Sequence, residues 1–304
     1  MHESYTVSVV IPTRNRAHLL TRALESVLNQ SRRPDEVLVV DDASSEDIRN
    51  AVMAWSKDVR VIRSDRNIER GAARNLGARE ARGQLLAFLD SDDYWQPTKL
   101  ERQLEVAGGH VASVTGIDMV DSEGRIVRSH YVPPNDAGAR ILERNLYLGG
   151  PSSLLIPKDL FFAVGGFEQR WAVQGSEDWL LFAKLMRLGH RVAVVPEPLV
   201  VYLVHSANST ADPDRVAVSM WTAVEYLRHE GRVTGAVLQR LRADTARLIA
   251  GGFAARGRFR EAQAWTARAL RAGTPGDGLQ TLVRVSRSAI GGGMLRRLGL
   301  RRAI

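Results

Sequence analysis

The stretch LLAFLDSDDYW, residues 85–95, decides the fold predicted for this chain of 304 residues. Its first five residues are apolar, which is typical of a strand buried on both faces of a parallel sheet. The run then delivers Asp90, Ser91, Asp92 and Asp93 to the carboxyl edge of that sheet. Carboxylates gathered this closely repel one another unless a cation lies among them, and Mg²⁺ is commonly held by one or two carboxylates with phosphates. The stretch therefore suggests a cation and diphosphate site, although an acidic turn that caps the next helix explains it equally well.

Strands and helices alternate in the part of the chain that precedes this stretch. The predicted strands are residues 5–11, 36–40, 59–62 and 85–90, and the predicted helices between them are 15–30, a segment ending near 55, and 69–81. This alternation predicts an α/β fold with a doubly wound, mostly parallel sheet. Ligands of such sheets bind at the carboxyl ends of the strands.

Three of these strand ends carry polar residues. They are Thr13-Arg14, Asp41-Asp42 and the acidic run after residue 89, and we expect them to meet in one crevice. The first strand is not followed by Gly-x-Gly-x-x-Gly, and the chain contains no Gly-x-x-x-x-Gly-Lys-Ser. The sequence therefore argues against a dinucleotide-binding Rossmann enzyme and against a phosphate-loop NTPase.

Composition narrows the class of protein. The hydrophobic fraction of 44% and the charged fraction of 25% are those of an ordinary globular protein. The absence of cysteine excludes disulfides, thiolate zinc sites and cysteine nucleophiles. No signal peptide is visible, and the apolar run at 192–204 is interrupted by Pro196, Glu197 and Pro198, so no membrane span is predicted and a cytoplasmic location is expected.

Positive charge is concentrated at the C-terminal end. Residues 215–304 hold 17 arginines, no lysine and 5 acidic residues, which leaves residues 1–214 with a net charge of −4. Helices are predicted there at 216–229, 234–250, 259–272 and 279–288. We therefore expect a basic helical region at residues 213–304, appended to a larger domain at residues 1–212. Its arginines either contact an anionic partner or reflect a GC-rich coding bias on a solvated surface.

Four stretches together carry a family resemblance: VSVVIPTRNRAHLL, EVLVVDDASSED, GAARNLGAREARGQLLAFLDSDDYW and GSEDWLLFAKLMRLGH. Their order and spacing resemble a family 2 glycosyltransferase of the GT-A fold, across about residues 5–210. The resemblance implies a GT-A catalytic domain that binds a nucleoside-diphosphate sugar, usually with uracil as the base.

The resemblance also implies which residues bind the nucleotide. Pro12, Thr13 and Arg14 would line the base, and Asp41 would accept a hydrogen bond from the uracil imide. Asp42 would hold its loop through an Asx turn or a cap before Ser44 and Ser45.

Further residues follow from the Arg-Asn pair and the Asp-x-Asp motif of the family. Arg74 and Asn75 would brace the nucleotide and its loop, although an arginine at this position can also simply pair with Asp41. Asp90 and Ser91 would face the nucleotide. Asp92 would hold Mn²⁺ or Mg²⁺, with Asp93 as an additional ligand or a supporting residue.

The acceptor side is predicted from the helix that begins at Glu177 and Asp178 and ends at Gly189. A carboxylate at a helix N-terminus is kept ionised and can act as a general base, whereas the alternative is a residue that only caps the helix. The resemblance favours Asp178 as the base, with Glu177 orienting the acceptor. It also places His205 where family members carry a histidine that reaches the metal, although a lone histidine is as often structural.

The resemblance implies an inverting, metal-dependent transfer of a sugar from a UDP-sugar to a saccharide, lipid-linked or peptide acceptor, and no nucleic acid partner is expected. Two alternatives stay open. A nucleotidyltransferase would need a glycine-rich basic loop after the first strand, and a binding module would not need Asp178. Apolar residues alternate with arginines over residues 279–304, so this segment either lies on the inner face of a membrane or packs on the preceding helices.

Overall fold

The structure is a computed structural model that describes residues 5–55, 57–131, 150–205 and 212–272. Contacts between residues divide the chain into two compact units, which are described separately. The first comprises residues 1–138 and 147–203, and the second comprises residues 139–146 and 204–304. The division falls near residue 204, a few positions before the predicted boundary at residue 212.

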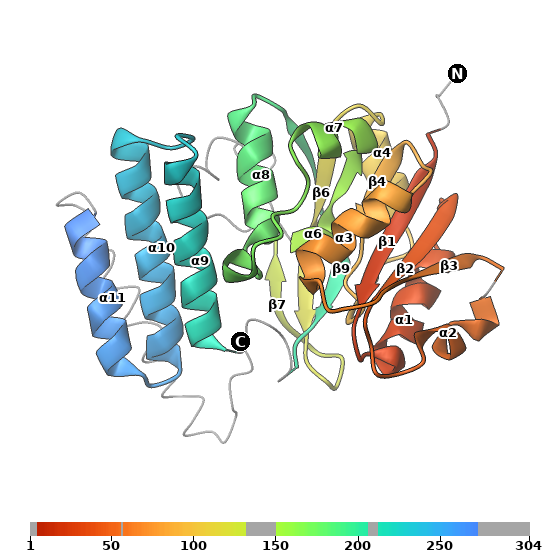
Figure 1. The fold of residues 1–304 in the computed structure, drawn as a ribbon, viewed down its shortest axis with the longest axis horizontal. Coiled ribbons are helices and arrows are strands. Elements are labelled where there is room, and N and C mark those ends of the chain that lie inside the picture. Colours follow the sequence, from red (N-terminus) through yellow and green to blue (C-terminus); the bar gives the residue numbers. More distant parts are fainter. Residues whose placement is uncertain (1–4, 56, 132–149, 206–211, 273–304) are drawn as a thin grey trace. The chain divides into compact units, whose positions relative to one another are not determined.

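The first unit is built on one nine-stranded sheet with the order β3-β2-β1-β4-β8-β6-β9-β5, and β7 pairs with β6 (Figure 1). The strands are β1 Val7–Thr13, β2 Glu36–Asp42, β3 Val59–Ser64, β4 Leu85–Phe88, β5 Asp93–Trp95, β6 Ala112–Val120, β7 Ile126–His130, β8 Leu155–Pro157 and β9 Val192–Leu203. β1 to β4 are mutually parallel, as predicted. β8 runs antiparallel to both β4 and β6, which makes the second half of the sheet mixed.

Helices cover both faces of this sheet, which confirms the doubly wound α/β fold. They are α1 Ala17–Leu28, α2 Ile48–Ala51, α3 Glu69–Glu80, α4 Lys99–Ala107, α6 Gly150–Ser153, α7 Lys158–Ala163 and α8 Glu177–Arg187. Short 3₁₀ turns occur at Met53–Trp55 and Trp171–Val173.

Alternate residues of the central strands face different helices. Val9, Val39 and Ala87 share one apolar cluster with Leu24 of α1 and Leu100 of α4. Both faces are therefore apolar, and all seven residues of β1 are buried. Burial of one such aliphatic side chain contributes about 1.5–3 kcal/mol, which explains why these strands are continuous apolar runs.

The opposite face packs closely against α3. A Cβ atom at Gly77 would lie 2.3 Å from a side-chain carbon of Val10 and 2.9 Å from one of Val40. A glycine is therefore needed where α3 crosses β1 and β2. This close packing fixes the position of Arg74, which lies one helical turn earlier.

One strand end differs from the sequence prediction. β4 ends at Phe88, two residues before Asp90, and Asp93 begins the separate strand β5. β5 pairs antiparallel with β9, with Asp93 opposite Tyr202. Asp90, Ser91 and Asp92 therefore form a tight connection between two strands rather than the start of a helix, because Asp93 is drawn into the sheet.

The second unit contains three helices among its described residues, α9 Pro213–His229, α10 Gly235–Ala255 and α11 Phe259–Ala272. They confirm three of the four helices predicted there. The Asp212 carboxylate accepts hydrogen bonds from the first backbone N–H groups of α9. Trp221 and Trp265 pack edge to face with ring centroids 5.3 Å apart. The fourth predicted helix and the basic segment 279–304 lie outside the described residues.

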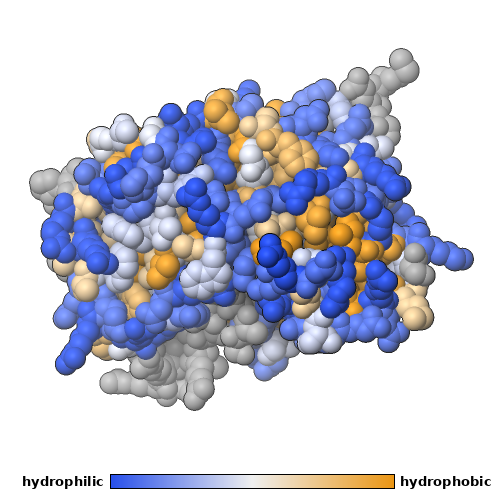
Figure 2. Space-filling model, in the orientation of Figure 1, coloured by the Kyte–Doolittle hydropathy of each residue, from blue (hydrophilic) through white to orange (hydrophobic). Residues whose placement is uncertain are grey.

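The visible surface is mainly hydrophilic, with smaller apolar groups between the polar residues (Figure 2). Within the described part of the chain, no helix combines the length and the apolar composition needed to cross a membrane.

Candidate active site

The predicted convergence of polar strand ends is present in the first unit. β1 and β2 are paired so that Thr13 lies beside Asp41, and β4 runs parallel to β1 on its other side. The carboxyl ends of these strands therefore lie at one edge of the sheet. The candidate site is built on this edge and on the helices α3 and α8.

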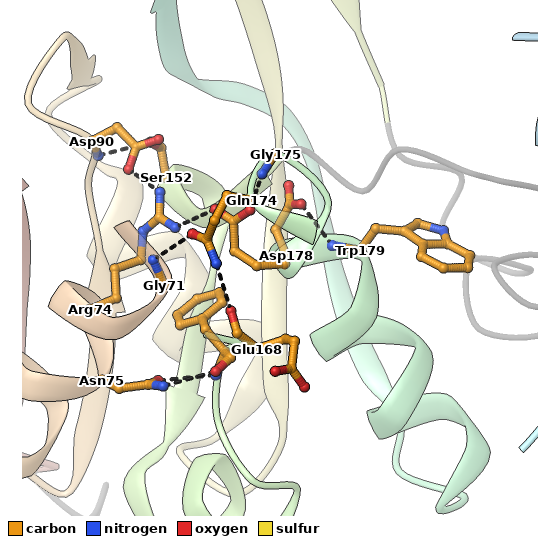
Figure 3. A network of polar contacts seen from close by, with 12 residues as sticks. Gly71, Arg74, Asn75, Asp90, Ser152, Glu168, Gln174, Gly175, Asp178 and Trp179 are labelled. Atoms are coloured by element: carbon orange, nitrogen blue, oxygen red, sulfur yellow. Dashed lines mark hydrogen bonds and ion pairs between the residues drawn. The ribbon is translucent and has the colours of Figure 1, made fainter. Parts of the chain in front are cut away.

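Arg74 is the centre of a buried charge network (Figure 3). Its side chain is 1% exposed, and its two terminal nitrogens contact carboxylates from different elements. Nη1 lies 2.8 Å from Glu177 Oε1 of α8, and Nη2 lies 2.5 Å from Asp90 Oδ1. Burial opposes the charge of Arg74, but Asp90 and Glu177 raise its pKa on balance. Arg74 thus ties the acidic strand end to the helix that carries the predicted base. The Asp41 carboxylate pairs with Arg63 instead, which answers the alternative left open for Arg74.

Glu177 is placed differently from the sequence expectation. It is 2% exposed, one oxygen contacts Arg74, and the other accepts the backbone N–H of Gly175. Burial would raise its pKa, but Arg74, Arg70 and this N–H group lower it on balance. A buried carboxylate with both oxygens occupied is poorly placed to orient an acceptor. We therefore reassign Glu177 to positioning Arg74.

Asp178 is half-buried in the first turn of α8, next to Glu177. One of its oxygens accepts the backbone N–H of Trp179 at 2.8 Å. Burial, followed by the negative charge of Glu177, raises the pKa of Asp178 to about 7. The expectation that this carboxylate is kept firmly ionised is therefore corrected, because burial and Glu177 outweigh the N–H group of Trp179 and the charge of Arg74, which lower the pKa. Two adjacent carboxyl groups with pKa values pushed apart are typical of an acid–base site.

The loop before α8 is held against α3 by two buried amides. Asn75 donates to the carbonyl of Phe167 at 2.8 Å and accepts its N–H at 3.0 Å. The Gln174 side chain accepts the N–H of Gly71 and donates to the carbonyls of Glu168 and Arg170. Asn75 therefore braces a loop of the protein, and its contact with the nucleotide stays a prediction. Gln174 was not predicted, because nothing in the sequence marks a glutamine in a loop as buried.

The loops beyond the carboxyl end of β2 are fixed by the aspartates of this strand. Asp41 is 2% exposed, and Oδ1 accepts the N–H of Ser44 at 2.9 Å. Asp42 accepts the N–H groups of Ile68 and Glu69 at 2.7 and 3.1 Å. Asp42 thus holds the loop before α3, and it is Asp41 that makes the turn at Ser44.

The three residues predicted to line the base have different environments. Pro12 and Thr13 are buried within β1, whereas Arg14 is exposed. The buried hydroxyl of Thr13 has no hydrogen-bond partner among the described residues.

The acidic run places its carboxylates in three environments. Asp90 contacts Arg74, whereas Oδ2 of Asp92 lies 2.5 Å from Nη1 of Arg16. Asp93 is buried, and its Oδ2 accepts the hydroxyl of Ser152 at 2.6 Å. Burial, followed by the charges of Asp92 and Asp90, raises the pKa of Asp93 well above its usual value.

These residues fit a cation held by few protein ligands. Among the residues that the structure describes, none forms a hydrogen bond with the buried Oδ1 of Asp93, and Asp92 already attracts a cationic group. Within the described residues, no group of three or more ligating side chains is arranged to hold a metal ion. The donor set therefore suits Mg²⁺ or Mn²⁺ bound through one or two carboxylates, with phosphates completing the shell. His205 belongs to the second unit, and its role as a metal ligand stays a prediction.

Comparison with known proteins agrees with this geometry. Residues 8–164, just over half of the chain, match the model of glycosyl transferase family 2. The chain belongs to this family. Among its relatives, an uncharacterized glycosyltransferase of Haemophilus influenzae is 29% identical over 228 residues, which are 73% of this chain and 76% of that protein. The succinoglycan biosynthesis protein ExoO of Rhizobium meliloti is 36% identical over 66% of this chain and 62% of its own length.

Solved structures with a similar fold include two complexes. One is residues 1–349 of TarS from S. aureus with UDP-GlcNAc, with a TM-score of 0.64 and 21% identity, covering 97% of this chain and 92% of the other. The other is the mannosyltransferase PcManGT of Pyrobaculum calidifontis with GDP-Man and Mn²⁺, with a TM-score of 0.60 and 19% identity, covering 96% and 86%. The family makes the protein a glycosyltransferase, which favours transfer over the two alternatives drawn from sequence.

Proposed function

We propose that this glycosyltransferase moves a sugar from a UDP-sugar to a saccharide, lipid-linked or peptide acceptor, with inversion and with Mn²⁺ or Mg²⁺. The observation that carries the proposal is the half-buried Asp178 carboxylate, whose pKa of about 7 suits a general base. Support for the donor comes from the UDP-GlcNAc complex of TarS, and support for the metal comes from the Mn²⁺ complex of PcManGT. Support for a saccharide product comes from the name of the succinoglycan protein.

Each group in the site has a role in this proposal. Asp178 removes the proton of the acceptor hydroxyl, which then attacks the anomeric carbon opposite the leaving diphosphate and inverts it. General base catalysis of this kind contributes about 10²- to 10⁴-fold. Arg74 keeps Glu177 and Asp90 in place, which fixes the position of the general base Asp178 relative to the edge of the sheet that binds the donor. The nucleobase of the donor is surrounded by Pro12, Thr13, Arg14 and Asp41.

The metal would be held by Asp92, with Asp93 as a candidate for a further ligand. When bound, such an ion neutralises charge that develops on the leaving diphosphate. The Asp90 carboxylate, already paired with Arg74, would face the ribose together with Ser91.

A screen of sugar nucleotides by thermal unfolding tests the donor and the metal together. A ligand present at about 100 times its Kd stabilises the folded state by about 2.7 kcal/mol, which raises the Tm by several degrees. We expect this shift with UDP-sugars in the presence of Mn²⁺ and a much smaller one without it. If only GDP-sugars raise the Tm, the proposed uracil nucleobase is wrong. If the Tm rises equally after the metal is chelated, the proposed metal dependence is wrong.

Replacement of Asp92 by asparagine is expected to abolish the metal-dependent part of UDP binding. The amide keeps the shape of the side chain but loses the charge that attracts a divalent cation. Isothermal titration with UDP and Mn²⁺ measures this loss. Asp58→Asn is the matched control, because Asp58 is exposed and precedes the amino end of β3, away from the site. Affinity at the wild-type level in Asp92→Asn would remove Asp92 from the metal site.

A further inference from the structure

Arg16 and Asp92 form an ion pair that the proposed chemistry does not use. We propose that, in the enzyme without donor, Arg16 occupies the cation's place on Asp92, so that Arg16 and the metal compete and the metal binds well only together with a nucleoside diphosphate. The inference rests on the proposed function, since it concerns the cation and the diphosphate of the donor. It assigns to Arg16 a role as a positioning residue that sets the order of ligand binding.

The geometry of the pair supports strong competition. Nη1 of Arg16 lies 2.5 Å from Oδ2 of Asp92, and the Asp92 side chain is 9% exposed. A charged hydrogen bond to a largely buried carboxylate is stronger than the same contact in water. A divalent ion that approached this oxygen would meet the positive guanidinium at van der Waals range. The two positive charges therefore repel each other, and the presence of Arg16 weakens binding of the metal to Asp92.

The backbone that carries Arg16 is held in place, so that the competition involves the side chain only. Asn15 adopts a left-handed conformation with φ of 52°, and its side-chain oxygen accepts the N–H and hydroxyl of Ser45. The N–H of Ala17 donates to Glu46 at 3.0 Å. These bonds join the turn after β1 to the loop after β2. The long side chain of Arg16, which is 30% exposed, is the part that can move.

A diphosphate removes the conflict between the two cations. Its charges offer Arg16 a second anionic partner beside Asp92, and guanidinium groups bind phosphate oxygens well. The same phosphates complete the shell of a metal on Asp92. Binding of Mn²⁺ and of UDP should therefore be positively coupled, and Arg16 should contribute to that coupling.

The test measures binding of Mn²⁺ alone, by electron paramagnetic resonance of the free ion, in the absence of nucleotide. Removal of the competing charge in Arg16→Met is expected to tighten Mn²⁺ binding about 10- to 100-fold, the size of a charged hydrogen bond. Arg16→Lys retains the charge on a different head group and is expected to fall between Arg16→Met and the wild type. Titrations of UDP with and without Mn²⁺ should show weaker coupling in Arg16→Met.

Arg22→Met is the matched control. Arg22 lies on α1, with its guanidinium carbon 3.5 Å from the ring centre of Tyr94. Tyr94 follows Asp92 by two positions, so Arg22 is close to Asp92 in the structure but contacts Tyr94 instead. Its removal deletes the same charge from the same neighbourhood and is expected to change Mn²⁺ affinity only slightly. Unfolding midpoints close to that of the wild type establish that the variants are folded.

The outcomes separate the inference from the proposed function. Equal Mn²⁺ affinity in the wild type and Arg16→Met, or an equal gain in Arg22→Met, overturns the competition. In that case Mn²⁺-dependent UDP binding by the wild type still leaves the proposed function standing. A wild type that binds no UDP, with or without Mn²⁺, overturns both.

Discussion

Replacement of Asp178 by asparagine is expected to lower kcat at least about 100-fold while the affinity for the sugar nucleotide stays nearly unchanged. The reason is that a general base acts on the acceptor proton in the transition state and contributes little to binding of the donor in the ground state. The measurement is steady-state turnover with the native acceptor, together with a donor titration. Near-normal turnover would mean that Asp178 only stabilises the start of α8.

The pH dependence of the wild type follows from the same carboxylate. Because burial and Glu177 raise the pKa of Asp178 to about 7, and because only the ionised form accepts a proton, kcat should rise with pH up to about 7 and then level off. Below this pH the rate should fall about tenfold per pH unit. A rate that stays constant from pH 5 to pH 8 would exclude this residue as the base.

The stability of the folded wild type should fall as pH rises, whereas kcat should rise. A carboxyl group whose pKa is higher in the folded state than in the unfolded state reduces stability as pH rises between the two values, here between about 4 and about 7. Asp178→Asn lacks this loss and should be as stable as the wild type near pH 4. Above pH 7 it should be more stable, by at most about 4 kcal/mol for three pKa units. Urea unfolding at both pH values measures the difference.

Replacement of Arg74 by methionine is expected to cause a large loss of stability, about 3–5 kcal/mol. The substitution leaves Glu177 and Asp90 without the cation that compensates them, and Glu177 is almost completely shielded from water. Urea unfolding at neutral pH measures the loss. Arg79→Met is the control, since Arg79 is exposed on the same helix and is expected to change stability by less than about 0.5 kcal/mol.

A second substitution tests the cause of this loss. Glu177→Gln in the Arg74→Met background removes one of the two uncompensated charges, so part of the lost stability should return. If the double variant is as unstable as the sum of the single variants predicts, the charge pair is not responsible. The loss would then come from the packing of Arg74 against Phe167, whose ring centre lies 5.2 Å from the guanidinium carbon.

The parallel half of the sheet could be predicted from local sequence pattern. Continuous apolar runs in β1, β2 and β4 are buried on both faces, and such runs look the same whatever their neighbours are. Parallel strands end at one edge, so the meeting of Thr13, Asp41 and the acidic run also followed from order alone. The residues at which β4 ends and β5 begins could not be predicted from the sequence pattern, because Asp93 enters the sheet only through the pairing of β5 with β9.

The sequence by itself thus determined the α/β fold, the family resemblance and the edge of the sheet that carries the site, since all three depend on the order and periodicity of nearby residues. The tertiary structure decided the partners of the charged side chains. Arg74 and Glu177 are 103 positions apart, and Arg16 and Asp92 are 76 apart. Whether a carboxylate faces a ligand, an arginine or a backbone N–H depends on how helices pack on the sheet, and the pKa of Asp178 depends on the burial that this packing creates.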